Sequence, residues 1–447
     1  MSTSEQSVRP TAREGHEAEI RRVVFSSYLG NTIEYYDFIL YGSASALLFG
    51  PLFFSSLSAS WAFAASFATL ATGYVARPMG GVIFGFIGDR IGRKPILLAT
   101  MLLMGLSSGL IGALPTYASA GVIAPILLVT LRVLQGFAVG GEWGGAALMI
   151  AEHAPPESRG RYAAIGQSGL ASGGLLSTVA LALVTQLPDS ALYSWGWRLP
   201  FLASFALVLV GLYVRRRVGE SPLFRELGER EDKIRNNKRI QMIRVRPLLR
   251  GFAITLPPLV ASTIVGAFAV SYAVEAGFTP STTLVALCAA WALSIISMPC
   301  YGRLSDRVGR RPVYITAALA FAALSYPFFW LIDTGSLPLL FAAFLVMFSL
   351  VTVAMTAVVG SLLVELFPTE ARYTAVSVAY QGGAIVGGLA PIAATGLLAL
   401  PVGVGGVSAL LSGIALIALI AAWSSPESRG STLRGEVGHS ATGDRLS

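Results

Sequence analysis

Five charged residues stand inside long apolar stretches of the sequence: Glu34, Asp37, Arg77, Arg132 and Glu142. Charged side chains at membrane depth are rare and usually carry protons, ions or substrates. A carboxyl group can bind and release a proton. The guanidinium group of arginine keeps its charge and presents a fork of donors that matches a carboxylate. These residue types therefore indicate proton transfer and anion binding.

Glu34 and Asp37 are three residues apart, so on a helix they share one face. If that helix starts near Val23, Glu34 lies ~16 Å along it, close to the middle of a bilayer core. Two adjacent acids in a low dielectric cannot both ionise cheaply, so one is expected to hold a proton near neutral pH. We predict that both couple protons to transport, and that Glu142, set among four glycines, is a second carrier. Alternatively, the two acids only pair with arginines, and Glu142 only makes a packing hydrogen bond.

Arg132 and Gln135 share a helix face near the middle of their stretch, and we predict that both bind substrate. For Arg132 the alternative is a salt bridge to Glu34 or Asp37. Arg77 precedes Pro78, where a helix bend is expected. It is therefore predicted either to bind substrate or to cap the carbonyl groups that the bend releases.

The second half of the chain carries no charge at the corresponding depth. Leu345 and Met355 lie 213 residues after Arg132 and Glu142, respectively. This half is therefore expected to contribute shape and hydrogen bonds, from Tyr272 and Gln381, with Gln167 as the counterpart of Gln381 in the first half. The alternative is that these polar residues only pack helices together.

The elements that position these residues follow from composition. Hydrophobic residues make up 54% of the chain, charged residues 13%, and the mean hydropathy is +0.68. Soluble domains carry roughly 25% charged residues, so a multi-spanning membrane protein is indicated. Backbone groups in lipid must pair within the segment, which predicts an all-α protein. Twelve helices in two six-helix bundles are predicted, at about 23–49, 61–88, 95–114, 121–150, 161–186, 197–214, 251–276, 281–302, 312–332, 337–363, 373–399 and 403–424.

The basic residues predict the orientation. Of the 32 Lys and Arg residues, all but Arg77, Arg132 and Arg198 fall in the two tails or in loops on one side. The positive-inside rule places that side, with both termini, in the cytoplasm of a cell-membrane protein. The net charge of +8 thus reflects topology and not a nucleic-acid partner. The expected partners are the bilayer, protons and a small-molecule substrate, and the functional unit is expected to be a monomer.

A glycine-rich, charged motif occurs twice, at 85–94 and 302–311, 217 residues apart. Its acid could accept hydrogen bonds from the first amides of a facing helix. The motif would then close the cytoplasmic side, while the alternative is a signal for topology alone. The second copy is expected to matter less, because Ser305 stands where the first copy has Gly88. We predict a cytoplasmic gate formed by Asp89, Arg90, Arg93, Asp306 and Arg310.

The repetition divides the chain into five parts. They are a disordered cytoplasmic tail (1–20), a first bundle (21–214), a basic cytoplasmic linker in which a surface helix could form (215–250), a second bundle (251–424) and a cytoplasmic tail (425–447). Nucleotide-binding motifs and clusters of nucleophile and base are not found, which argues against an ATP-driven pump or an enzyme. No metal or cofactor is expected, and His153 is isolated.

Further motifs are Gly-Asn-Thr-Ile-Glu-Tyr-Tyr-Asp-Phe at 30–38, Arg-Pro-Met-Gly at 77–80, Gly-Gly-Glu-Trp-Gly-Gly at 140–145, Trp-Gly-Trp-Arg-Leu-Pro at 195–200 and Glu-Leu-Phe-Pro-Thr-Glu-Ala-Arg-Tyr at 365–373. With these motifs the chain resembles the major facilitator superfamily, and within it the metabolite:H⁺ symporters, nearest to the shikimate-transporter branch. The resemblance spans residues 20 to 430. It implies proton-coupled symport of a small polar metabolite, most simply an organic acid such as shikimate or a dicarboxylate, by alternating access. The alternatives are a zwitterion (proline or betaine) symporter and a proton-independent exporter or uniporter.

Overall fold

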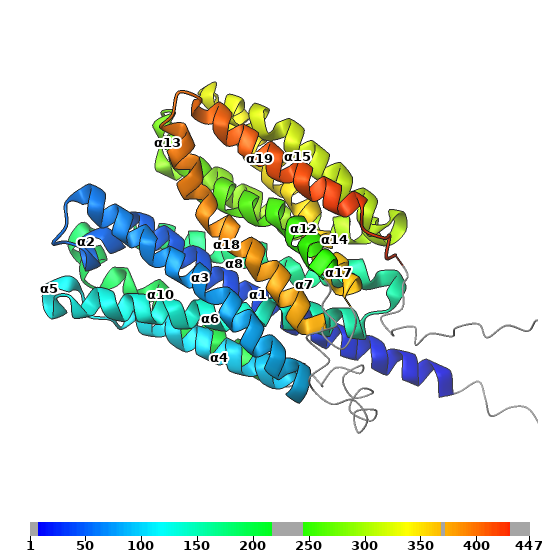
Figure 1. Ribbon diagram of the computed structural model, residues 1–447. Helices are drawn as coiled ribbons and strands as arrows, with labels where there is room; N and C mark the ends of the chain where they lie inside the picture. Colours follow the sequence, from blue (N-terminus) through cyan, green and yellow to red (C-terminus); the bar gives the residue numbers. More distant parts are fainter. Residues whose placement is uncertain (1–7, 217–244, 368–371, 430–447) are drawn as a thin grey trace, which may run out of the picture.

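The computed structural model describes residues 8–216, 245–367 and 372–429, and these ranges form two bundles of helices (Figure 1). The surface helix considered for the linker falls mostly within 217–244, outside the described residues. The first bundle contains α1 (Val8–Leu47), α2 (Phe49–Phe53), α3 (Ala59–Ile91), α4 (Arg93–Gly112), α5 (Tyr117–Ala120), α6 (Ile123–His153), η1 (Pro156–Ser158), α7 (Arg159–Gln167), α8 (Gly169–Val184), α9 (Asp189–Ala191), η2 (Leu192–Gly196) and α10 (Arg198–Arg216).

The second bundle is built in the same way. Two of its membrane segments contain π-helical turns, η6 and η7. Its elements are α12 (Val245–Thr263), η6 (Ile264–Phe268), α13 (Ala269–Glu275), α14 (Pro280–Val308), α15 (Arg310–Asp333), α16 (Leu337–Phe344), η7 (Leu345–Thr352), α17 (Val353–Leu366), α18 (Arg372–Leu398) and α19 (Gly403–Trp423).

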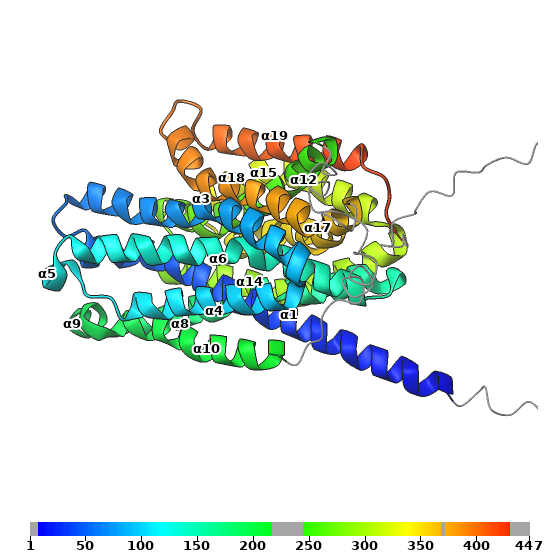
Figure 2. The same ribbon diagram turned by 60° about the horizontal axis from the view of Figure 1, so that its bottom comes forward.

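Eleven helical segments of the described chain are long and apolar enough to span a membrane, and α1 is the twelfth helix. Its 40 residues include polar side chains at mid-length, among them Asn31, Glu34 and Asp37, which lower its hydropathy. The prediction of a disordered tail over 1–20 is wrong from Val8 onward, because α1 already begins there. Figure 2 shows these first turns projecting beyond the bundle.

The two copies of the gate motif form the same joint between helices. Only Gly92 separates α3 from α4, and only Gly309 separates α14 from α15. Their φ angles are 108° and 106°, a backbone conformation that glycine adopts far more readily than other residues. The repeat seen in the sequence is therefore a repeat of backbone geometry.

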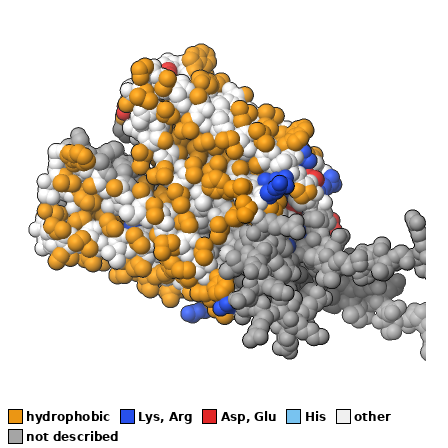
Figure 3. All heavy atoms as spheres, viewed as in Figure 1, with side chains coloured by type: hydrophobic (Ala, Val, Ile, Leu, Met, Phe, Trp, Pro, Cys, Tyr) orange, Lys and Arg blue, Asp and Glu red, His pale blue; other side chains and the backbone are white. Residues whose placement is uncertain are grey.

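The basic end of the molecule is the end that carries Arg90, Lys94, Arg216, Arg303 and Arg307. Figure 3 shows Lys and Arg side chains gathered near one end, beside a flank that is largely hydrophobic. That distribution suits a protein whose flank faces lipid and whose basic end faces water.

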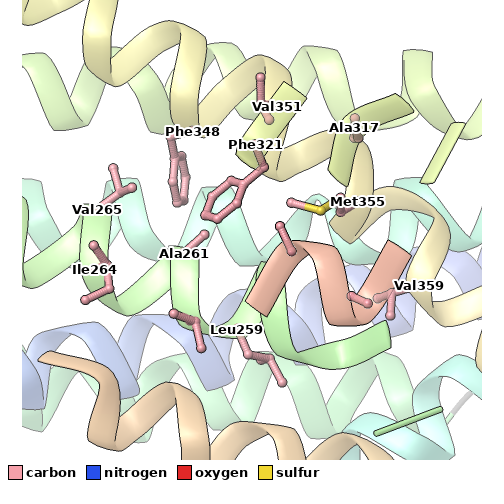
Figure 4. Close-up of a cluster of buried hydrophobic side chains, with 14 of the residues drawn as sticks. Leu259, Ala261, Ile264, Val265, Ala317, Phe321, Phe348, Val351, Met355 and Val359 are labelled. Carbon is pink, nitrogen blue, oxygen red and sulfur yellow. The ribbon is translucent and has the colours of Figure 1, made fainter. Parts of the chain in front are cut away.

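The core of the second bundle is apolar at mid-depth. In Figure 4, Phe321 and Phe348 lie beside Val265 and Met355. Met355 is fully buried in this cluster, at the position that corresponds to Glu142 in the first half. The expectation that the second half carries no charge at this depth is confirmed for the described residues.

The two bundles contact each other closely from the basic end to mid-depth. A Cβ atom on Gly85 would lie 3.0 Å from Cα of Thr374 in α18, and one on Gly302 would lie 2.6 Å from the carbonyl oxygen of Gly160. Nearer the middle, Gly388 of α18 contacts the ring of Tyr74. Residues without side chains at these positions let the helices approach and close the basic end.

Candidate functional site

Glu142 forms a buried ion pair with an arginine that the sequence did not single out. The Nη1 atom of Arg215 lies 2.7 Å from Oε1 of Glu142 and also donates to the carbonyl oxygen of Leu97 at 3.1 Å. Both side chains are buried. Glu34 lies in the same electrostatic neighbourhood, and its Oε2 atom is buried without a hydrogen-bond partner among the described residues.

Arg215 was assigned to the linker because hydropathy drops after Val214. Helix α10 continues to Arg216, however, and its last turn packs Arg215 inward while Arg216 stays exposed. The signal available in the sequence was indirect. A buried Glu142 needs a cation, and a basic pair at a helix end can supply one.

Asp37 belongs to a second polar cluster within the first bundle. The hydroxyl of Ser204 donates to Oδ1 of Asp37, and Ser108 also interacts with this carboxyl group. Gln135 donates to the Ser108 hydroxyl at 2.6 Å and accepts from Nη1 of Arg132 at 2.6 Å. Hydrogen bonds thus run from Arg132 through Gln135 to Ser108, which lies beside the acid. Ser108 and Ser204 were not predicted as site residues, because serines in membrane helices often only form hydrogen bonds that hold neighbouring helices together.

Arg77 and Arg132 both stack on the ring of Phe38. Their guanidinium carbons lie 4.2 and 4.6 Å from its centroid, and Arg132 also lies 4.1 Å from the centroid of Tyr41. Such cation–π contacts hold arginines where few acceptors are available. Among the side chains that the structure describes, neither arginine forms an ion pair, and each has a buried Nε atom without a partner.

The other predicted substrate residues lie in different places. Gln381 reaches from α18 across to α6 and donates to the carbonyl oxygen of Gly140 at 3.2 Å. Gln167 accepts a long hydrogen bond of 3.4 Å from Asn31. Tyr272 donates to Asp333 at 2.7 Å, towards the end of the second bundle opposite the basic end. The structure therefore does not bring Tyr272 together with the arginines.

Aromatic contacts join the bundles beside the acids. Trp143, next to Glu142, stacks on Tyr380 of α18 with the ring centroids 3.4 Å apart. The hydroxyl group of Tyr35, next to Glu34, lies 3.2 Å from that of Tyr380. Each acid is therefore one residue away from a contact with the opposite bundle.

A small cavity of about 20 Å³ lies between the bundles, enough for about one water molecule. Tyr35 and Tyr380 line it together with hydroxyl groups of the second bundle, including Thr352 and Thr356. The predicted arginines do not line it. The cavity is therefore bordered by hydroxyl groups from both bundles and lies apart from the predicted arginines.

The second copy of the gate motif makes the contact that was expected of the motif's acid. The Oδ1 and Oδ2 atoms of Asp306 accept from the backbone N–H groups of Gly160 and Arg161 at 2.9 and 2.8 Å. These amides lie in the first turn of α7, and Arg310 completes the contact with a 2.6 Å ion pair to Asp306. The side chains of Asp89 and Arg93 lie outside the described residues, and Arg90 stacks on Phe86 at 3.8 Å.

A buried carboxylate connects this gate to the first bundle. Glu365 of α17 lies 3.0 Å from Nη1 of Arg159 and 3.8 Å from Nε of Arg310. Ser428 also donates to this carboxylate. In the sequence Glu365 stood only within the motif at 365–373, because its partners come from segments distant in the chain.

Comparison with known proteins identifies the family. Residues 23–248 match the protein-family model described as "Sugar (and other) transporter", and residues 258–441 match the family model described as "Major Facilitator Superfamily". A shikimate transporter of Escherichia coli (strain K12) is 38% identical and covers 87% of this chain and 90% of its own length. A proline/betaine transporter of Salmonella typhimurium is 32% identical, with 86% and 78% covered.

Solved structures agree on the fold. The proton:xylose symporter XylE bound to 6-bromo-6-deoxy-D-glucose superposes with a TM-score of 0.77 at 19% identity, and 94% of this chain and 98% of that chain are covered. XylE from E. coli in an inward-open conformation gives 0.66, with 93% and 98% covered. The chain belongs to the major facilitator superfamily. It is a multi-pass membrane protein and a transporter of metabolites, and not an enzyme.

Proposed function

We propose that this transporter imports a small organic acid together with protons across the cell membrane, with both termini in the cytoplasm. The observation that carries the proposal is the clustering of Glu34, Asp37 and Glu142 beside arginines within the first bundle. Buried acids can carry protons through a conformational cycle, and arginines suit an organic anion.

The arrangement of the arginines supports an acidic substrate. Arg132 is held by Gln135 and by two aromatic rings, and its Nε and Nη2 atoms have no partner among the described residues. A buried guanidinium group with unused donors is suited to a carboxylate that enters from outside. The similarity to a shikimate transporter points to a cyclic hydroxy acid as the first substrate to test.

Alternating access is supported by the contacts between the bundles. Asp306 and Glu365 join the bundles at the basic end, and the Trp143–Tyr380 stack joins them nearer to mid-depth. All of these contacts must separate before the site can open on the basic side. With the basic end in the cytoplasm, the conformation seen is closed towards the cytoplasm. A monomer contains every residue of this proposal.

A zwitterion substrate is the second candidate, because relatives named as proline/betaine transporters are 31% and 32% identical to this chain. One experiment separates the two. The purified protein is reconstituted in proteoliposomes, and uptake of labelled shikimate, 2-oxoglutarate, proline and glycine betaine is measured with and without an inward proton gradient. Gradient-driven uptake of an acid supports the proposal. Uptake of betaine alone supports the alternative, and uptake that does not depend on the proton gradient indicates a uniporter.

A further inference from the structure

Two charged groups meet against α1 at Gly30, where this helix has no side chain. A Cβ atom on Gly30 would lie 2.9 Å from Oε1 of Glu142 and 2.5 Å from Nη2 of Arg215. The ion pair between Arg215 and Glu142 therefore rests directly against α1. Glu34 follows Gly30 by four residues, which places it one turn further along the same face.

Arg215 is fixed in this position from two sides. Besides Glu142, it binds the carbonyl oxygen of Leu97 in α4. The next residue, Arg216, is tied to the same helix, because its carbonyl oxygen accepts from Nζ of Lys94 at 3.0 Å. The last turn of α10 is thus attached to the start of α4, and Arg215 cannot behave as a mobile surface arginine.

The two carboxyl groups of this group are paired unequally. Arg215 forms its direct ion pair with Glu142, whereas Glu34 forms no ion pair with any described residue, and its Oε2 atom has no hydrogen-bond partner. The ionisable groups that face Glu34 are Glu142, Arg215, Arg77, Tyr35 and Tyr380. Arg77 is engaged with the rings of Phe38 and Tyr74, at 4.2 and 4.8 Å, and forms no described ion pair with Glu34. An unpaired buried carboxylate is costly, whereas one in a direct ion pair keeps its charge more easily.

We propose that Arg215 is a positioning residue that acts as the fixed counter-ion of Glu142, which leaves Glu34, of these two acids, as the one that carries a transported proton. The proton adds to a carboxylate oxygen of Glu34 on one side of the membrane and leaves from the same group on the other. Glu142 stays ionised and Arg215 stays charged throughout. This inference rests on the proposed proton coupling, and it assigns different roles to two acids that the sequence treats alike.

The test needs no substrate. The C=O stretch of protonated carboxyl groups is recorded by infrared difference spectroscopy during a pH titration of the purified full-length protein. Asp37→Asn identifies the band of Asp37. The band that remains should disappear in Glu34→Gln and persist in Glu142→Gln. In Arg215→Gln a further protonated carboxyl group should appear, and it should be absent from the double variant Arg215→Gln/Glu142→Gln. Arg215→Lys should restore the wild-type titration.

Two results would overturn the assignment: loss of the band in Glu142→Gln with retention in Glu34→Gln, or an Arg215→Gln titration identical to wild type. If Arg215→Gln does not fold, the comparison of the two glutamine variants still decides which acid titrates. In a separate arm, proteoliposomes loaded with a pH-sensitive dye report proton influx when shikimate is added. Absence of influx with every substrate of the uptake panel would refute proton coupling, and the infrared result would still decide the role of Arg215.

Discussion

The carboxylate of Asp306 in α14 accepts hydrogen bonds from two successive backbone amides, Gly160 and Arg161, at the start of α7. The two residues of each contact belong to different bundles, 145 and 146 positions apart. The negative charge lies at the positive end of a helix, where such contacts contribute about 0.3–2 kcal/mol. One side chain thereby holds the bundles together at the basic end.

Asp306→Asn should therefore weaken the closed state of the basic end. The amide keeps one acceptor but loses the charge that meets α7 and Arg310. We expect faster labelling of a cysteine introduced at position 305, which is buried, and slower transport with normal amounts of protein in the membrane. Asp333→Asn, at the opposite end, is the matched control. Unchanged labelling and transport in Asp306→Asn would reduce the motif to a topology signal.

Two substitutions of Tyr380 should separate the contributions of its ring stack and of its hydrogen bond to the closed state of the basic end. Tyr380→Phe keeps the stack on Trp143 and removes the hydrogen bond to Tyr35, which should cost about 0.5–1.5 kcal/mol. Tyr380→Ala removes both and should open the basic end further. Cysteine accessibility at position 377, which faces Gly144, measures this order. Equal accessibility in both variants would show that the ring stack contributes nothing.

Arg132→Lys should distinguish substrate binding from a structural role. Lysine keeps the charge but loses the fork of donors, so loss of a carboxylate contact should cost roughly 2–5 kcal/mol in binding. Affinity for the acid found in the uptake panel should fall well over tenfold, because each tenfold change in Kd corresponds to about 1.4 kcal/mol. Half-esterification of a dicarboxylate should have a similar effect on the wild type if that substrate binds. Unchanged affinity in Arg132→Lys would remove this arginine from the substrate site.

Glu34→Gln should abolish concentrative uptake and retain exchange of labelled for unlabelled substrate. The glutamine fills the same volume but cannot bind and release a proton, so the substrate can cross in both directions without being driven. Uptake against a concentration gradient and exchange are measured in the same proteoliposomes. Full concentrative uptake in the variant would assign the proton to another group.

Gly140→Ala should destabilise the first bundle, because a Cβ atom there would overlap the carbonyl oxygen of Arg77 where α3 and α6 cross. Overpacking of this kind costs about 1–3 kcal/mol. Gly413→Ala in α19 is the control, since nothing lies within 4 Å of the added atom. Thermal unfolding in detergent should show a lower midpoint for the first variant only. Equal midpoints would mean that the helices adjust without cost.

The sequence alone determined the fold class, because long apolar segments and the one-sided distribution of Arg and Lys are properties of composition and order. The repeat at 85–94 and 302–311 also predicted a shared structural unit, and the structure shows it as matching glycine joints at Gly92 and Gly309. Burial of Glu34, Asp37, Arg132 and Glu142 followed from their apolar surroundings.

Only the tertiary structure decided which charged groups meet. Arg215 looked like a linker residue, because a helix end at the membrane surface has no hydropathy signal that distinguishes an inward side chain from an outward one. Its partner Glu142 is 73 positions away, and the pair exists because α10 and α6 both pack against α4. Likewise, Glu365 meets Arg159 across 206 positions only when the two bundles close. Spacing along a helix predicts a shared face, but contacts between helices depend on how whole helices pack.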